Sequence, residues 1–264
     1  MILLCGVAYL LLRPSARPRP TGCAAGPAGE QIQLAPDQAG IAATIAGVAT
    51  RQALPTRAVA IAYATALQES KMQNLHYGDL DSVGVFQQRP SQGWGTVRQI
   101  EDPVYATERF FGALTAVPGY LQLPIDVAAQ DVQRSADGSA YGQYASVGSV
   151  LAAAFTGVDP RAVWCSYADP PGPVGLSAAG RAMTAAFGLT ARRGGAGDSM
   201  IIAVGTSAAG WAVAAWLVTH ADDYGVGSVR YQGYQWLGFS GSGRWTAEPA
   251  GPGVAGGTAA VEFG

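Results

Sequence analysis

Apolar side chains recur at helical spacing through most of residues 37–187, which predicts a mainly helical fold for this part of the chain. In one stretch nearly every side chain is apolar. Between Ala58 and Leu67 the only clearly polar residue is Thr65, so this helix is expected to be buried on almost all sides. The same helix ends on a carboxylate, Glu69. Helices are expected at residues 37–53, 56–69, 103–117, 126–134, 139–156 and 176–187.

Two other regions follow different patterns. Residues 72–102 lack a helical period and are interrupted by glycine and proline, which indicates a loop with a short hairpin around residues 83–87. Beyond residue 199, short β-prone runs flank one helix at residues 208–224. Strands are expected at residues 200–204, 229–231, 234–237 and 244–246. The sequence therefore predicts a mainly α protein that ends in a small α/β module.

These patterns divide the chain into five parts. We interpret residues 1–34 as a signal or anchor followed by a Pro-rich stalk. The remaining parts are a helical domain at residues 35–188, a flexible linker at 189–198, the small α/β module at 199–248 and a disordered tail at 249–264.

The apolar run at residues 2–12 suggests where the protein works. It is too short to cross a bilayer alone, which takes about 20 residues, but it suits the core of a signal peptide or the end of an anchor. We therefore expect an extracytoplasmic protein, secreted or anchored at the cell envelope, which contacts the membrane through this segment if it is not cleaved.

Composition narrows the possible partners. The 264 residues are 49% hydrophobic and 13% charged, with a net charge of −2, so we expect no nucleic-acid partner. The two histidines and three cysteines lack metal-ligand spacing, so neither a metal nor another cofactor is expected. In an oxidising compartment Cys23 and Cys165 can form a disulfide.

Glu69 is the candidate general acid. A carboxylic acid in water-poor surroundings keeps its proton more readily, and it can then protonate the leaving oxygen of a glycosidic bond. The loop that starts at Gly84 reads G-V-F-Q-Q-R-P-S-Q-G-W-G, which is rich in amides and aromatic rings. Phe86 and Trp94 can stack on sugar rings or pack within the loop.

Two aspartates offer a different mechanism. Asp79 and Asp81 follow Glu69 closely, in the loop beside the expected cleft. Either can act as a second carboxylate that positions water for hydrolysis. The alternative is that both residues form turns, because Y-G-D-L-D-S is good turn sequence.

The sequence A-L-Q-E-S at residues 66–70, followed by G-V-F-Q at residues 84–87, resembles the first two motifs of SLT-type lytic transglycosylases, a branch of the lysozyme-like superfamily. The longer pieces Y-G-D-L-D-S-V-G-V-F-Q-Q-R-P-S-Q-G-W-G and D-P-V-Y-A-T resemble an actinobacterial group of secreted proteins of that superfamily. The resemblance covers roughly residues 35–165. It implies a lysozyme-like helical domain.

The resemblance also implies a reaction and a set of site residues. Glu69 would act as the only acid and base, cleaving the bond between N-acetylmuramic acid and N-acetylglucosamine in peptidoglycan glycan strands. A lytic transglycosylase forms a 1,6-anhydro product by this route, whereas a muramidase would use water. The residues expected to support the acid or contact the saccharide are Ser70, Gly84, Phe86, Gln87, Gln88, Trp94 and Tyr141.

One motif of the family is missing. The family has a Tyr-Asn pair whose tyrosine orients the glutamate, but the only asparagine here is Asn74. Tyr141, Gln133 or Arg134 can supply the missing partner. The departure leads to a second hypothesis, in which the protein binds or scaffolds the cell wall without cleaving it.

Overall fold

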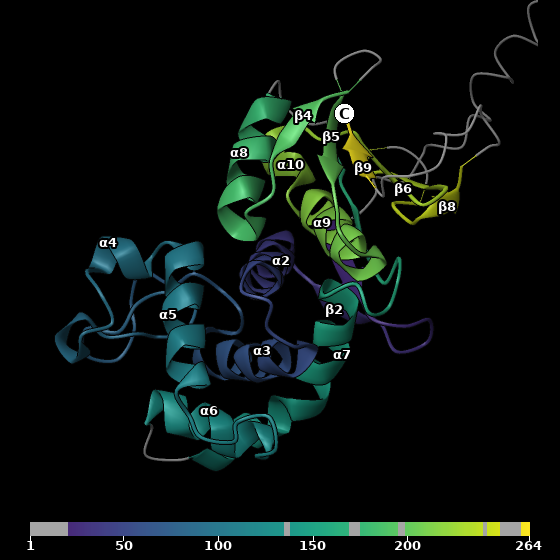
Figure 1. The fold of residues 1–264 in the computed structure, drawn as a ribbon. Coiled ribbons are helices and arrows are strands. Elements are labelled where there is room, and N and C mark those ends of the chain that lie inside the picture. Colours follow the sequence, from purple (N-terminus) through teal and green to yellow (C-terminus); the bar gives the residue numbers. More distant parts are fainter. Residues whose placement is uncertain (1–20, 135–137, 169–174, 195–198, 240–241, 249–259) are drawn as a thin grey trace, which may run out of the picture.

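The computed structural model describes residues 21–134, 138–168, 175–194, 199–239, 242–248 and 260–264, and this part of the chain is mainly helical with small antiparallel sheets (Figure 1). Every helix expected from the hydrophobic pattern is present. The helix expected at 139–156 begins as the 3-10 helix η2, and the one expected at 208–224 is divided into α9 and α10. The helices are α2 (Pro36–Arg51), α3 (Thr56–Ser70), η1 (Pro90–Gln92), α4 (Val97–Ile100), α5 (Pro103–Thr115), α6 (Ile125–Gln133), η2 (Gly138–Tyr144), α7 (Ala145–Phe155), α8 (Leu176–Phe187), α9 (Ser207–Thr219) and α10 (Ala221–Tyr224).

Helix α3 lies at the centre of the helical part and is buried as its sequence predicts. It begins after Pro55 and ends where Lys71 adopts a left-handed conformation, with φ of 56°. Its closest packing partner is α7, because Gly148 lets the two backbones approach each other closely. The phenol of Tyr63 is fully buried and donates a hydrogen bond of 2.6 Å to the Ala42 carbonyl of α2. The helix that carries Glu69 is thus fixed on several sides.

The first sheet contains strands that the sequence analysis did not predict. It has three strands in the order β2-β1-β3, with β1 at Gly22–Ala25, β2 at Ile32–Leu34 and β3 at Val163–Ser166. Cys23 lies directly opposite Cys165, and the predicted disulfide joins them. The segment interpreted as a stalk therefore contributes two strands. They could not be recognised because each is very short and β1 pairs with a partner about 140 residues away.

The second sheet has the order β4-β5-β9-β6-β7-β8. Three of the four strands predicted for the module are present as β5 (Met200–Ala203), β6 (Ser228–Tyr231) and β7 (Tyr234–Leu237), while the one predicted at 244–246 begins two residues later as β8 (Thr246–Ala247). The other two differ from the prediction. Strand β4 (Ala191–Arg193) lies in the segment expected to be a linker, and β9 (Ala260–Phe263) lies in the expected disordered tail and occupies the middle of the sheet.

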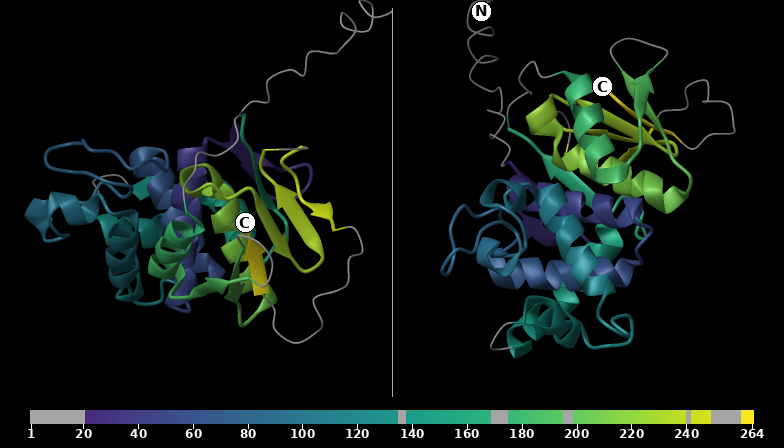
Figure 2. Two further views of the ribbon diagram at one scale, coloured as in Figure 1. Left: turned by 90° about the horizontal axis from the view of Figure 1, so that it is seen from above. Right: turned by 60° about the vertical axis from the view of Figure 1, so that its left-hand side comes forward.

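The C-terminal module shares a core with the helical part. Helix α9 packs on α2, which lies between α9 and α3 (Figures 1 and 2). Two indole N–H groups of the module donate across the junction, from Trp236 to the carbonyl of Cys165 at 3.0 Å and from Trp245 to that of Val163 at 2.7 Å. One continuous cluster of buried apolar side chains includes residues from both parts.

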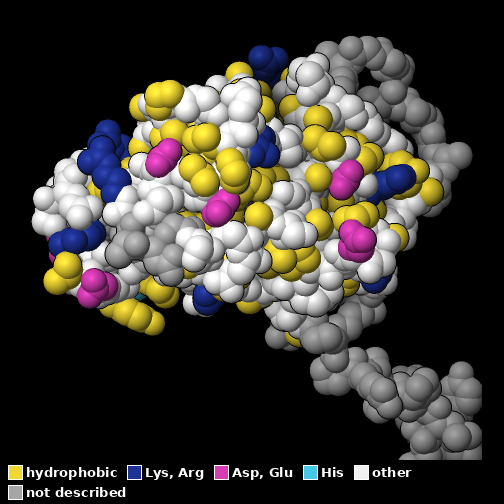
Figure 3. All heavy atoms as spheres, turned by 90° about the horizontal axis from the view of Figure 1, so that it is seen from below, with side chains coloured by type: hydrophobic (Ala, Val, Ile, Leu, Met, Phe, Trp, Pro, Cys, Tyr) yellow, Lys and Arg dark blue, Asp and Glu magenta, His cyan; other side chains and the backbone are white. Residues whose placement is uncertain are grey.

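The membrane segment suggested by the sequence lies at residues 2–12, outside the described residues. Within the part that the structure describes, no helix has the length and apolar character needed to cross a bilayer. The disulfide fits an oxidising compartment. On the face shown in Figure 3, charged side chains are scattered singly and in small groups among apolar ones, and they form no extended area of one sign.

Candidate functional site

Glu69 lies in the last turn of α3, where its side chain is half-buried. Its Oε1 atom accepts a hydrogen bond of 2.6 Å from the hydroxyl of Tyr141. Tyr141 belongs to η2, and its side chain is only 1% exposed. A buried phenol has few alternative positions, so this contact fixes the orientation of the carboxylate. Of the three residues that could replace the missing Tyr-Asn partner, the structure brings Tyr141 onto Glu69.

The residues beneath Glu69 leave space for the carboxylate. Thr65 and Ala66 lie one helical turn earlier on the same face and Ala62 lies two turns earlier, and all three are small and buried. The hydroxyl of Thr65 donates to the Ile61 carbonyl at 2.8 Å, so it is satisfied within the helix. The polar group that α3 presents at this position is therefore the carboxylate of Glu69.

Hydrogen bonds hold the G-V-F-Q loop, residues 84–87, beside Glu69. The buried Ser70 hydroxyl donates to the Val85 carbonyl at 2.7 Å, and the Gln133 amide donates to the Phe86 carbonyl at 2.8 Å. A bridge between Val83 and Gln88 forms the short hairpin that the sequence predicts. Ser70 thus supports the site indirectly, by holding the loop against the end of α3.

Gly84 is required by the shape of this loop. Its φ of +79° is a conformation that side chains disfavour, and an added Cβ would lie 2.6 Å from the Ile100 carbonyl oxygen. The backbone conformation and the close approach to Ile100 therefore require glycine at this position.

Two residues expected at the saccharide site belong to the core. Phe86 is fully buried and stacks on Phe110 with a ring-centroid distance of 4.4 Å. Gln88 is 2% exposed, and its amide donates to the Ala106 carbonyl at 3.1 Å. Neither side chain can reach a polymer at the surface. The motif gave no sign of this, because a short loop sequence does not reveal which side chains point inward.

Gln87 and Trp94 remain partly exposed. Gln87 adopts a left-handed conformation, and its amide donates to the carbonyls of Gly84 and Tyr77 at 3.2 and 3.3 Å. In the described structure Gln87 therefore braces its own loop. Trp94 is half-buried and borders a cavity.

The two aspartates have separate local roles. Asp81 forms an ion pair with Arg89 at 2.8 Å and accepts hydrogen bonds from the backbone and side chain of Ser91. The bond from Arg89, followed by that from the Ser91 backbone, lowers the pKa of Asp81 to about 2. Asp79 is exposed, and its carbonyl accepts the Ser82 N–H at 3.0 Å, which forms a turn. These contacts match the turn-forming alternative.

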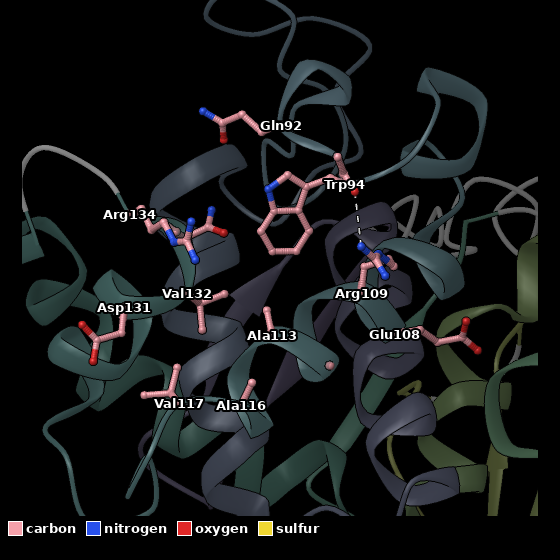
Figure 4. A pocket seen from close by; sticks show the side chains of 13 residues that line it. Gln92, Trp94, Glu108, Arg109, Ala113, Ala116, Val117, Asp131, Val132 and Arg134 are labelled. Carbon is pink, nitrogen blue, oxygen red and sulfur yellow. Dashed lines mark hydrogen bonds between the residues drawn. The ribbon is translucent and has the colours of Figure 1, made fainter.

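Two cavities open near these elements. One of about 710 Å³ lies between α5, α6 and the loop at residues 92–94 (Figure 4). The other, of about 750 Å³, lies where α2 and the loop at 73–77 meet the module. Glu69 lines neither, but Gln133 lines the first cavity while its amide holds the loop beside Glu69.

The second cavity surrounds His220, which the sequence analysis did not place at a site. Burial lowers the pKa of His220 to about 4. Burial also raises the pKa of Asp223, and the Asp222 charge raises it further. No local sequence pattern predicts these shifts, because burial is their first cause and the cavity is closed by α2 and the loop at residues 73–77, which are far from His220 in the chain.

No group of histidine, cysteine and acidic residues in the described part of the chain has the arrangement of a metal site. Comparison with protein-family models and with curated proteins finds no match to this sequence. The assignment of a function therefore rests on the motifs and on the site geometry.

Proposed function

We propose that this protein is an exported enzyme that cleaves the glycosidic bond between N-acetylmuramic acid and N-acetylglucosamine in peptidoglycan, with Glu69 as its single general acid and base. The observation that carries the proposal is the 2.6 Å hydrogen bond from the buried Tyr141 to the Glu69 carboxylate. A catalytic acid must be held in one orientation relative to the bond that it protonates. The disulfide between Cys23 and Cys165 supports export.

The reaction balances with one carboxyl group. Glu69 in its protonated form donates its proton to the glycosidic oxygen, and the bond from that oxygen to C1 of the muramyl ring breaks. The resulting carboxylate then accepts the proton of the muramyl C6 hydroxyl, whose oxygen bonds to C1. The product carries a 1,6-anhydro ring, no water is consumed, and Glu69 returns to its starting form.

The contacts of Asp81 favour this route over hydrolysis. A second carboxylate that positions water must face the reacting carbon. The side chain of Asp81 is instead bonded to Arg89 and Ser91. A lytic transglycosylase is therefore the preferred form of the proposal, and a muramidase that uses Asp79 is the alternative.

The test is incubation of purified protein with cell-wall sacculi, using wild type and Glu69→Gln. We expect soluble muropeptides with anhydro ends from wild type and at least a hundredfold slower release from the variant, because its amide cannot donate the required proton. Glu30→Gln is the matched control, since Glu30 is exposed in the turn between β1 and β2.

Three other outcomes are informative. Equal release by wild type and Glu69→Gln would reject Glu69 as the acid. Products with reducing ends, heavier by one water, would identify a muramidase. Binding to sacculi without release by either protein would support the second hypothesis of a non-catalytic wall-binding protein.

A further inference from the structure

The cavity between α5 and α6 has the features of a binding site. It has a volume of about 710 Å³. Figure 4 shows the indole of Trp94 extending into it, above small or aliphatic residues of both helices. The lining residues are Gln92, Gly93, Trp94, Glu108, Arg109, Gly112, Ala113, Ala116, Val117 and 131–134.

Two guanidinium groups flank the indole. Arg134 follows the end of α6, while Arg109 comes from α5 and donates to the Gly93 carbonyl at 3.2 Å. In Figure 4 they lie on opposite sides of Trp94. The backbone around both is anchored, because the Gln133 side chain bonds to Phe86 and the Tyr105 hydroxyl donates to the Trp94 carbonyl at 3.2 Å.

The acidic residues that line the cavity do not neutralise the positive charges of Arg109 and Arg134. In Figure 4 the carboxylates of Asp131 and Glu108 point away from the indole. Glu108 also forms an ion pair with Arg51 outside the cavity lining. The centre of the cavity therefore presents an aromatic surface between two cations. Arginine binds carboxylates with paired N–H groups, and an indole accepts an aliphatic or sugar surface.

A short chain of hydrogen bonds connects the cavity to the candidate acid. Gln133 lines the cavity and bonds to the Phe86 carbonyl, while Ser70 bonds to the neighbouring Val85 carbonyl. Ser70 follows Glu69 directly in the sequence. The cavity and the end of α3 that carries Glu69 therefore contact the same loop at Phe86 and Val85, although Glu69 itself does not line the cavity.

We propose that the cavity binds the carboxylate-bearing peptide substituent of the glycan, with the carboxylate between Arg109 and Arg134 and the neighbouring sugar or aliphatic surface on Trp94. This inference rests on the proposed function for the identity of the polymer. It assigns the enzyme a preference for peptide-substituted over bare glycan.

The test measures binding without turnover. The probe is N-acetylmuramyl-L-alanyl-D-glutamate, which has no glycosidic bond to cleave, and the comparison probe is its diamide. We expect wild type to bind the acid about tenfold more tightly than the diamide, because a hydrogen-bonded ion pair is lost. Arg109→Gln and Arg134→Gln should each weaken binding of the acid by about tenfold and leave the diamide unaffected.

The matched control is Arg98→Gln, because Arg98 is an exposed arginine of α4 that does not line the cavity. It should bind both probes as wild type does. Equal affinity of wild type for the acid and the diamide would overturn the inference, and so would unchanged binding of the acid by both arginine variants. Since this assay needs no cleavage, release of muropeptides with no acid preference rejects only the cavity, and acid binding without release rejects only the proposed enzyme.

Discussion

At the scale of single residues, the orientation of Glu69 depends on Tyr141. The tyrosine reaches the carboxylate from η2, 72 residues further along the chain. The sequence has no asparagine after this tyrosine, so the Tyr-Asn pair of the family that it resembles is absent. Geometry nevertheless provides the contact that such a motif would supply, because η2 packs against both α3 and α6.

Replacing Tyr141 by Phe should slow muropeptide release by about 10–100-fold, since a hydrogen bond to a charged group contributes about 1.5–3 kcal/mol. The ring would still fill its buried site, so the fold should persist. Release rates from sacculi, compared with urea unfolding curves, measure the two effects separately.

Tyr63→Phe is the control for the loss of a buried phenol. Its hydroxyl donates to the Ala42 carbonyl and does not touch Glu69. Tyr63→Phe should lose about 1 kcal/mol of unfolding free energy, and Tyr141→Phe about 1.5–3 kcal/mol because its bond is to a carboxylate. Release that falls equally in both would show that Tyr141 contributes only to stability.

From the sequence, it was easier to predict which residues lie near Glu69 than to predict what each of them does there. Ser70 lies at the site because it directly follows Glu69 in α3, and Tyr141 lies there because η2 packs against α3. Phe86 and Gln88 were expected to contact the saccharide, yet both are buried with most of the loop around them. Arg109 was missed because it lines its cavity through helix packing that no short motif describes.

At the scale of elements, the position of Glu69 depends on how α3 packs against α7. Gly148 of α7 lies against the backbone of α3, where an added Cβ would come within 2.8 Å of the Ala60 carbonyl oxygen. Backbone cannot rotate away as a flexible side chain can. The interface therefore has no room for even one methyl group.

Gly148→Ala should lower the unfolding free energy by about 1–3 kcal/mol, because overpacking forces the two helices apart. Gly112→Ala is the matched control in α5, where an added Cβ meets no atom within 4 Å. That change should stabilise the protein by about 0.5–1 kcal/mol, as alanine favours a helix over glycine. Chemical denaturation measures both values, and equal effects of the same sign would contradict this account of the interface.

Helices were predicted from the sequence far better than strands. A helix as long as α3 has several apolar residues at helical spacing within its own sequence, so its position can be predicted from that segment alone. Strands β1, β3 and β9 have four residues each and depend on partners distant in the chain, while β4 has only three residues and pairs with β5. Their pairing is decided by the tertiary fold, and local composition suggested a stalk, a linker and a tail instead.

At the scale of the whole molecule, His220 lies at the junction between the C-terminal module and the helical part. Its imidazole stacks on Trp216 with a centroid distance of 4.0 Å, and its Nδ1 donates to the Trp216 carbonyl at 2.8 Å. Its Nε2 faces Gly40 of α2. The acidic residues that line the same cavity are Asp37, Asp222 and Asp223. Burial nevertheless lowers the pKa of His220 to about 4, so the folded protein holds a neutral ring at the junction.

This neutral ring predicts how stability depends on pH. The ordinary pKa of histidine, about 6.5, applies to the unfolded chain. Between pH 6.5 and 4 the imidazole is therefore protonated in the unfolded state but stays neutral in the folded state. As the pH falls through this window, His220 should lower the unfolding free energy by roughly 2–3 kcal/mol. Urea unfolding at several pH values should show that the unfolding free energy of His220→Gln depends less steeply on pH than that of wild type.

His76→Gln is the control, because it removes an exposed imidazole whose side chain is 77% exposed. If both variants keep the slope of wild type, protonation of the junction does not limit the stability of the molecule in acid.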